Sequence, residues 1–188
     1  MAKAFIFMAE GFEDIEALAT ADVIRRGGVE VELISISEDP FVVSSHGVTV
    51  GTDSTLAYGV DIEKDDVMIF PGGMPGTRNL AACGPLIDCM KDHYADGGTV
   101  AAICAAPGLV LGQIDDLSGV RFTCFDSFEG LPQSKGAEFI KKPAVTCGNI
   151  ITGRSAGYAV AFGLEILKAM KGAAKAEEVA GSVRLACE

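Results

Sequence analysis

Residues 99–108 read TVAAICAAPG, and this stretch decides the fold. Residues 99–103 form a continuous run of apolar and β-branched side chains, which predicts a buried strand. A helix is predicted over residues 106–113, with Pro107 in its first turn, where proline is well tolerated. Cys104 therefore stands at a sharp strand-to-helix turn that needs small neighbours, and the chain supplies Ala101, Ala102, Ala105, Ala106 and Gly108.

This turn gives Cys104 a distinctive electrostatic setting. It has the geometry of the nucleophile elbow of serine hydrolases, although its residues differ. The sulfur is expected near the unpaired N–H groups at a helix start, where an anion is favoured. Such a position lowers a thiol pKa from about 8.5 to roughly 3.5–7.5, so we expect a thiolate near neutral pH. The alternative is an ordinary core cysteine, because free cysteine is among the most buried residue types.

Strand-like and helix-like segments alternate along the rest of the chain. Continuous apolar strands that alternate with helices indicate a mainly parallel sheet covered on both faces, an α/β three-layer sandwich. No repeat or linker divides the 188 residues, so we expect one domain over 1–188. The predicted strands are 3–8, 29–36, 67–70 and 99–103, with a hairpin or arm over 41–50 and two short strands over 145–152. The predicted helices are 13–27, 86–95, 106–113, 158–170 and 175–185.

A glycine pair follows the strand predicted over residues 67–70. Gly72 and Gly73 let main-chain N–H groups approach a ligand without a side chain in the way. In a parallel sheet this loop is expected beside the Cys104 turn, so the N–H groups of Gly73 and Ala105 can hold an oxyanion together. Taken alone, the pair is an ordinary strand-ending turn.

A carboxyl group is expected near the same place. Glu16 lies in the first turns of the helix predicted over residues 13–27, on the face that carries Ala19. A carboxyl buried beside a thiolate has a raised pKa, so Glu16 can donate a hydrogen bond to sulfur or carry a proton during catalysis. The alternative is a solvated helix residue.

Charge and composition argue against several classes of function. The chain has 26 acidic and 15 basic residues, a net charge of −11, so nucleic acids and anionic membrane surfaces would be repelled. No apolar run is long enough to span a bilayer or to form a secretory signal, and we predict a cytoplasmic protein. The chain has no dinucleotide fingerprint, no Walker loop and no tryptophan, so no cofactor is expected.

The cysteines and histidines show no metal-ligand spacing. Six cysteines and two histidines are present, with no C-x-x-C pair, so no metal site is expected. Reduced thiols are expected in a cytosolic chain, and at least four of the six should be buried apolar fillers. His93 stands among polar residues and is expected on the surface.

Three motifs occur in order: EDIEA at 13–17, PGG at 71–73 and AAICAAP at 101–107. Together they resemble the DJ-1/PfpI (ThiJ) superfamily, above all its DJ-1-like branch, and the similarity covers nearly the whole chain. The resemblance implies a flavodoxin-like fold, a homodimer and a reactive Cys104 hydrogen-bonded by Glu16. It also implies oxidation of Cys104 to a sulfinate held by Glu16 and by the amides of Gly73 and Ala105.

The chain departs from this pattern in its histidines. Human-type relatives carry a histidine near the cysteine where this chain has Phe125, and Phe125 and Cys124, with Gly72, are candidates for lining the site. No histidine follows Cys104, which excludes a cysteine–histidine dyad in the order of glutamine amidotransferases. Ala105 stands where the peptidase-like branch has histidine, which argues against a protease. His46, in the expected arm, is the remaining candidate, and the resemblance implies a role in trans, because in dimeric relatives this arm reaches toward the neighbouring subunit's site.

Two functions fit these residues. One is a glutathione-independent glyoxalase or deglycase, in which Cys104 attacks a small 2-oxoaldehyde such as methylglyoxal or glyoxal and Glu16 moves the proton. The other is an oxidative-stress sensor or chaperone that responds to oxidation of Cys104. Both need the same thiolate, so the sequence leaves the choice open.

Overall fold

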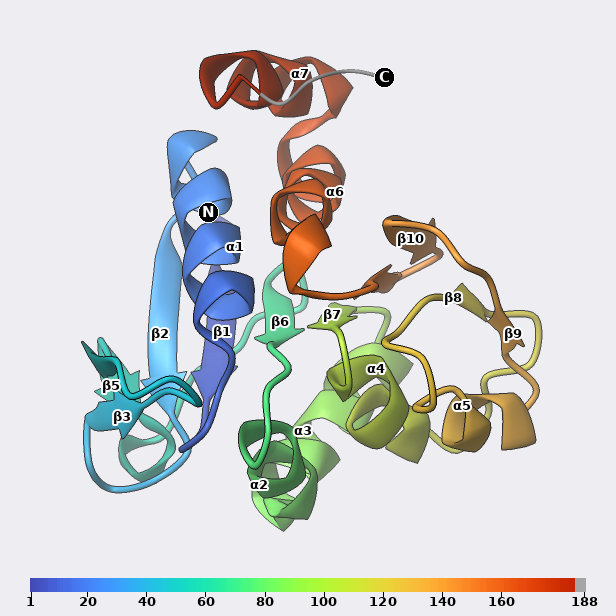
Figure 1. Ribbon diagram of the computed structural model, residues 1–188, viewed down its shortest axis with the longest axis horizontal. Coiled ribbons are helices and arrows are strands. Elements are labelled where there is room, and N and C mark those ends of the chain that lie inside the picture. The colour runs from blue at the N-terminus through green and yellow to red at the C-terminus, as the bar shows by residue number, and fades with distance from the viewer. Residues whose placement is uncertain (185–188) are drawn as a thin grey trace.

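The computed structural model describes residues 1–184 and has a central sheet of seven strands, drawn in Figure 1. Its strand order is β10-β11-β7-β6-β1-β2-β5. All neighbouring strands run parallel except β10 and β11, which pair antiparallel through the turn at residues 148–149. The strands are β1 Ala4–Met8, β2 Val31–Ser35, β5 Ser54–Thr55, β6 Val67–Phe70, β7 Thr99–Ile103, β10 Ala144–Cys147 and β11 Ile150–Gly153.

Helices cover both faces of this sheet, because successive side chains of each buried strand point to opposite sides. In β1, Ile6 and Met8 pack in one cluster, and Phe5 and Phe7 pack in the other. The first face carries α1 Asp14–Arg26, α6 Ala159–Lys171 and, beyond α6, α7 Ala173–Ser182. The second face carries α2 Gly76–Ala82, α3 Gly84–Ala95 and α4 Ala106–Leu109. The chain therefore has the three-layer, flavodoxin-like α/β fold that its sequence predicts.

Smaller elements stand at the edges of the sandwich. β3 Phe41–Val43 and β4 Thr49–Gly51 form an antiparallel hairpin, the arm expected over residues 41–50. β8 Arg121–Phe122 and β9 Glu138–Phe139 form a short parallel pair, and α5 Gly130–Ser134 lies between them in sequence. Three 3₁₀ turns, Leu56–Tyr58, Leu111–Gln113 and Ala156–Tyr158, complete the described elements.

Several predicted boundaries were wrong. The helix expected over 106–113 is broken at Val110, where α4 gives way to a 3₁₀ turn. A methyl group on Gly108 would lie 2.8 Å from Phe128 Cβ, so the segment is tightly packed against the loop before α5. The short helix α2 was not predicted. The last helix ends at Ser182 in α7, and Leu185 lies outside the described residues.

Two expectations about burial also fail. His93 is buried rather than on the surface, because its ring packs over Gly98 and its Nε2 hydrogen-bonds Asp66 O at 3.1 Å. Of the five cysteines within the described residues, only Cys124 is buried, and Cys89 is exposed. The sixth, Cys187, lies outside those residues.

None of the helices within residues 1–184 is both long enough and apolar enough to cross a membrane.

Candidate active site

The turn after β7 places Cys104 at the carboxyl edge of the sheet. Its backbone has φ of +65°, a left-handed conformation that costs a residue other than glycine about 1–3 kcal/mol. Hydrogen bonds on both sides hold this conformation: Cys104 N donates to Gly153 O at 3.0 Å, and Phe125 N donates to Cys104 O at 2.8 Å. The side chain is half-buried. The predicted sharp turn is confirmed. Hydrogen bonds to β11 and to the loop that carries Phe125 hold it in this strained conformation.

Glu16 reaches the same place from α1. Glu13 caps this helix, and its side-chain Oε2 accepts a hydrogen bond from Glu16 N at 2.8 Å. Glu16 itself is only 1% exposed, so the inward orientation predicted for it is confirmed. Its Oε2 accepts a hydrogen bond from Gly72 N at 2.8 Å, and the Cys104 thiol and the Ala156 amide also act on the carboxyl group.

The absence of a side chain at Gly72 lets the thiol and the carboxyl meet. A methyl group there would collide with Glu16 Oε2, and would lie 2.7 Å from Cys104 Cβ and 3.2 Å from Cys104 Sγ. Real side chains do not approach this closely, so only glycine fits between Glu16 and Cys104. Gly72 is therefore part of the site because of its size.

Gly73 presents its amide at the same edge. Its φ is +94°, a conformation that suits glycine. Thr77 fixes the loop by donating to Gly73 O from both its amide and its hydroxyl, at 2.9 and 2.8 Å. Within residues 1–184 the Gly73 N–H has no hydrogen-bond acceptor. It is thus available to an oxyanion, as is expected of this loop.

Burial is the largest influence on the pKa values of Glu16 and Cys104. It raises the pKa of Glu16 from 4.5 to about 7, although the hydrogen bonds with Cys104 and Gly72 act in the opposite direction. Burial, the Glu16 charge and the hydrogen bond to Glu16 together raise the pKa of the Cys104 thiol, and the Ala105 amide opposes this. The lowered thiol pKa predicted from the sequence is therefore wrong. That prediction counted helix amides, but α4 is a single turn and the sulfur also loses water and faces a carboxylate.

Cys124 and Phe125, which follow β8 and Thr123 in the chain, differ in burial. Cys124 is fully buried in the second core cluster, and burial raises its pKa to about 12. The amide of Phe125, the next residue, donates a hydrogen bond to Cys104 O, and the Phe125 ring is 49% exposed. The exposed ring packs edge-on against Phe128 at a centroid distance of 6.5 Å. Phe125 is therefore an exposed residue hydrogen-bonded to the backbone of Cys104, whereas Cys124 belongs to the core.

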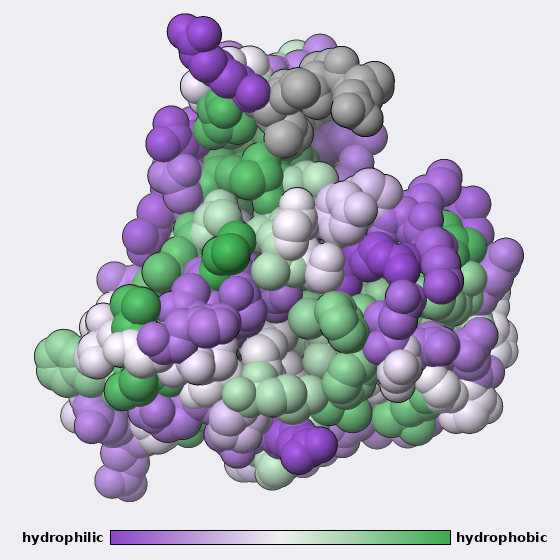
Figure 2. All heavy atoms as spheres, viewed as in Figure 1, coloured by the Kyte–Doolittle hydropathy of each residue, from purple (hydrophilic) through white to green (hydrophobic). Residues whose placement is uncertain are grey.

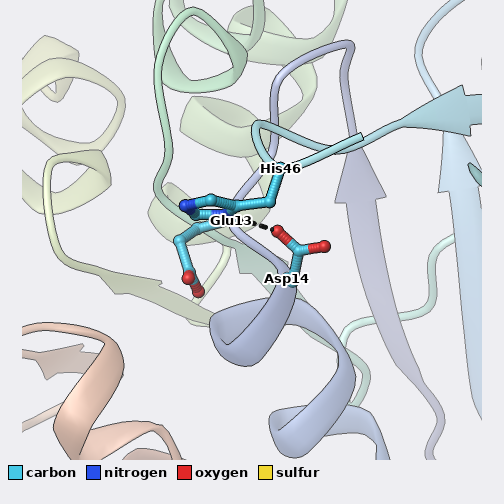
Figure 3. Close-up of side chains that lie close together, drawn as sticks. All are labelled: Glu13, Asp14 and His46. Carbon is cyan, nitrogen blue, oxygen red and sulfur yellow. Dashed lines mark hydrogen bonds and ion pairs between the residues drawn. The ribbon is translucent and has the colours of Figure 1, made fainter. Parts of the chain in front are cut away.

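His46 lies at the start of α1 of its own chain, as Figure 3 shows. Its Nδ1 is 2.8 Å from Asp14 Oδ2, and Ser44 Oγ donates to Asp14 Oδ1 at 2.6 Å. Donor atoms of Glu13, Asp14 and His46 all lie within 4.8 Å of one another, a spacing that a metal ion also needs. Each of these side chains already has a hydrogen-bond partner in the protein. The contact between Asp14 and His46 was not predicted from the sequence, because nothing local brings residue 14 to residue 46.

The family model described as the DJ-1/PfpI family matches residues 2–169. The chain belongs to the DJ-1/PfpI family. Protein DJ-1 homolog B of Arabidopsis thaliana is 35% identical over 180 residues, covering 95% of this chain, but the match spans only 40% of that longer protein.

Two further relatives match along most of their length. Protein dj-1beta of Drosophila melanogaster is 33% identical over 98% of this chain and 97% of its own. Its crystal structure covers 100% of both chains with a TM-score of 0.89 and 31% identity. The protein named glutathione-independent glyoxalase DJR-1.2, of Caenorhabditis elegans, is 31% identical over 88% of this chain and 87% of its own. These relatives place the chain on the DJ-1-like branch of the family.

Proposed function

We propose that the protein is a cysteine-dependent glyoxalase that acts without glutathione on small 2-oxoaldehydes such as methylglyoxal and glyoxal. The observation that carries this proposal is the meeting of the Cys104 sulfur and the Glu16 carboxyl on one side of Gly72. A nucleophile, a base of near-neutral pKa and a free amide at Gly73 are the groups that addition to an aldehyde needs. No cofactor takes part in this proposal.

The first step is addition of sulfur to the aldehyde carbon. The Glu16 carboxylate accepts the thiol proton of Cys104 as the C–S bond forms. The carbonyl oxygen becomes an oxyanion that the amides of Gly73 and Ala105 stabilise, and it is then protonated to a hemithioacetal. Because the Glu16 pKa lies near 7, this carboxyl can both accept and return a proton at neutral pH.

The second step moves hydrogen within the substrate. A base removes the proton from the former aldehyde carbon, which gives an enediolate, and a proton returns to the neighbouring carbon. The product is a 2-hydroxyacyl thioester on Cys104. Water then breaks the C–S bond, releases the 2-hydroxy acid and restores the thiol, so one water molecule is consumed and no oxidant is needed. A deglycase-type reaction would begin with the same attack on an early glycation adduct.

A relative supports the choice of reaction. The Caenorhabditis elegans protein named as a glutathione-independent glyoxalase aligns with 88% of this chain. The site also has no histidine beside Cys104, since Phe125 stands there, which argues against hydrolysis of peptides by a cysteine–histidine pair.

Lactate formation from methylglyoxal tests the proposal. The wild-type protein should form lactate, Cys104→Ser should lose at least about a hundredfold, and Glu16→Gln should be strongly impaired. Cys89→Ser changes an exposed cysteine on α3 and should leave the rate unchanged. Full activity in Cys104→Ser would reject the mechanism.

A redox role for the same sulfur is the second candidate. Cys104 is a half-buried thiol with the Ala105 amide beside its sulfur, a group able to hold an oxidised, anionic sulfur. Oxidation would then control a partner or a chaperone activity. Mass spectrometry after mild peroxide decides this point: modification of Cys89 or Cys83 while Cys104 stays reduced would remove the redox proposal.

We also propose that the protein forms a homodimer in the cytoplasm. Large apolar side chains are exposed on α1 and on the arm, and apolar residues gather over α1 and α6 in Figure 2. The exposed side chains on α1 and on the arm include Ile15, Leu18, Phe41, Val43 and Val48. Covering such side chains is a common reason for dimer formation. Sedimentation equilibrium of the wild-type protein and of Leu18→Glu tests this, and a wild-type monomer at micromolar concentration would rule it out.

A further inference from the structure

Two segments of the chain hold the backbone of Cys104, one on each side. Its amide donates at 3.0 Å to the carbonyl oxygen of Gly153, the last residue of β11, and its own carbonyl oxygen accepts from Phe125 N at 2.8 Å. The two segments are also joined directly, because Thr123 N donates to Thr152 Oγ1 at 3.0 Å. The left-handed φ of +65° at Cys104 therefore depends on how β11 and the loop after β8 are held relative to each other.

The next residue of each segment adds an ion pair to these bonds. Arg154 follows β11, Asp126 follows Phe125, and Arg154 Nη2 lies 2.8 Å from Asp126 Oδ1. Ion pairs in full contact with solvent contribute little, but the Arg154 side chain is only 19% exposed, and its Nη1 is buried without an acceptor within residues 1–184. Without Asp126 a largely buried positive charge would lose its compensation, which is unfavourable. The ion pair is therefore a firm connection between the two segments.

The loop that carries Asp126 is itself strained. Its next residue, Ser127, has a φ of +79°, which a residue other than glycine rarely adopts. The loop also packs against α4, directly after the Cys104 turn, since a methyl group on Gly108 would lie 2.8 Å from Phe128 Cβ. Cys104 and Ser127 are two of the three residues other than glycine that have a positive φ within residues 1–184. Both strained positions thus belong to this one set of contacts.

The conformation of the turn decides where the sulfur of Cys104 lies. In the observed turn the thiol meets the Glu16 carboxyl and interacts with it by a hydrogen bond and by charge. The carboxylates that act on the thiol are on α1, namely Glu16 and, more weakly, Glu13. Arg154 and Asp126 are not among these groups. We therefore expect the ion pair to affect the thiol through the geometry of the turn.

We propose that Arg154 and Asp126 are positioning residues that hold the turn at Cys104 in the conformation that keeps its sulfur at Glu16. The ion pair restrains the two segments on which the backbone bonds of Cys104 depend, so the strained turn does not relax by their moving apart. This inference rests on the proposed function in taking Cys104 as the reacting group. It applies equally to addition to an aldehyde and to oxidation of the sulfur.

The pH dependence of Cys104 alkylation by iodoacetamide tests this positioning. Asp126→Asn and Arg154→Gln each remove the ion pair, and both are measured as folded proteins. We expect each to raise the midpoint of alkylation by at least about half a pH unit and to slow alkylation at pH 7 at least about threefold. The reason is that Glu16, which accepts the thiol proton, no longer has the sulfur fixed beside it. The double variant should behave like the single ones, because either substitution already breaks the pair.

Hydrogen exchange of single amides distinguishes positioning from a general loss of stability. The Phe125 N–H should exchange at least about tenfold faster in both variants than in wild type, because its bond to Cys104 O opens more often. The Val67 N–H, which donates to Lys3 O at 3.0 Å at the start of β6, should keep its rate. An equal acceleration at both amides would mean that the whole fold is weakened, and it would overturn the proposal.

Lys141→Gln is the matched control. Lys141 Nζ lies 3.6 Å from Asp126 Oδ1 and its side chain is 67% exposed, so the substitution removes the same charge as Arg154→Gln but leaves the ion pair in place. Its alkylation midpoint and its Phe125 exchange rate should equal those of wild type. A shift of the same size in Lys141→Gln would assign the effect to charge alone and overturn the proposal.

An unchanged midpoint in Asp126→Asn and Arg154→Gln would also overturn it. If Arg154→Gln does not fold, Asp126→Asn decides by itself, because Asp126 is 56% exposed. Failure of the proposed function would look different: the wild-type protein would form no lactate from methylglyoxal, while the alkylation midpoints and the exchange rates would still separate the variants from wild type.

Discussion

The amide of Gly72 donates a 2.8 Å hydrogen bond to Oε2 of Glu16, and this bond ties the loop after β6 to the helix after β1. β6 and β1 are neighbours in the sheet, so their carboxyl ends bring the two segments to one edge. Cys104 arrives from β7, the next strand along. The site is thus made where three adjacent parallel strands end, and Gly72 is the residue that touches both reacting side chains.

Gly72→Ala tests this contact. The added methyl group would meet Glu16 Oε2 and the Cys104 side chain, so one of them must move. We expect Cys104 alkylation and lactate formation to fall at least about tenfold, with a loss of about 1–3 kcal/mol in the free energy of unfolding. Rates of alkylation and chemical denaturation measure the two effects.

Gly84→Ala is the control for that substitution. Gly84 begins α3 and has nothing within 4 Å of the position that a methyl group would take. Alanine there should leave the reactivity of Cys104 unchanged and should not lower stability. Equal behaviour of the two alanine variants would mean that the empty space at Gly72 is not needed for Glu16 and Cys104 to meet.

The pH dependence of Cys104 alkylation tests the coupling of thiol and carboxyl. With the Glu16 pKa near 7, the pair holds both protons in acid and loses the first one near neutrality. We expect the alkylation rate to rise with pH with a midpoint near 7, because the carboxylate then accepts the thiol proton. In Glu16→Gln the carboxamide cannot accept it, so the midpoint should move upward by about one unit or more. An unchanged midpoint in Glu16→Gln would show that the two groups titrate independently.

The same carboxyl should make stability depend on pH. Its pKa is raised from 4.5 in the unfolded chain to about 7 in the fold, so the unfolded chain binds fewer protons between these values. The contribution of Glu16 to the free energy of unfolding is therefore fully present below pH 4.5. It is lost as the pH rises through 7, and the loss amounts to about 3 kcal/mol. Glu16→Gln cannot lose this contribution. When the pH is raised from 4 to 8, its free energy of unfolding should therefore increase by that amount relative to wild type. Denaturant unfolding at both values measures it.

Glu177→Gln supplies the comparison for the stability measurement. Glu177 lies exposed on α7, so Glu177→Gln makes the same chemical change without removing a buried carboxyl. If Glu16→Gln and Glu177→Gln showed the same dependence on pH, the buried carboxyl would not be the cause.

Most of the fold was predictable because it follows from local pattern. The continuous apolar runs of β1 and β7 predicted buried strands. Glu13 and Gly27 bound α1 where the sequence placed its ends. The sharp turn at Cys104 was predictable for the same reason, since the residues around it are small. Glu16 followed from the helical face that it shares with apolar neighbours.

What could not be predicted depends on residues far apart in the chain. The Cys104 pKa was predicted in the wrong direction because burial and the Glu16 charge come from the packed fold and not from the turn. His93 was expected on the surface because its sequence neighbours are polar, yet it packs over Gly98 and hydrogen-bonds Asp66 O. The meeting of His46 with Asp14 likewise spans 32 positions. These are tertiary contacts that no local pattern records.

Phe125→His tests whether the missing histidine limits turnover. The amide of Phe125 donates a hydrogen bond to Cys104 O, and any residue other than proline can make this bond. The Phe125 ring is 49% exposed, so an imidazole can replace it without opening a cavity in the core. We expect stability to fall by no more than about 1 kcal/mol and lactate formation to rise at least about threefold, because an acid–base group then stands beside the thioester. Phe125→Leu keeps an apolar side chain and should show no gain. If the histidine and leucine variants turned over methylglyoxal equally, the missing histidine at position 125 would not limit turnover.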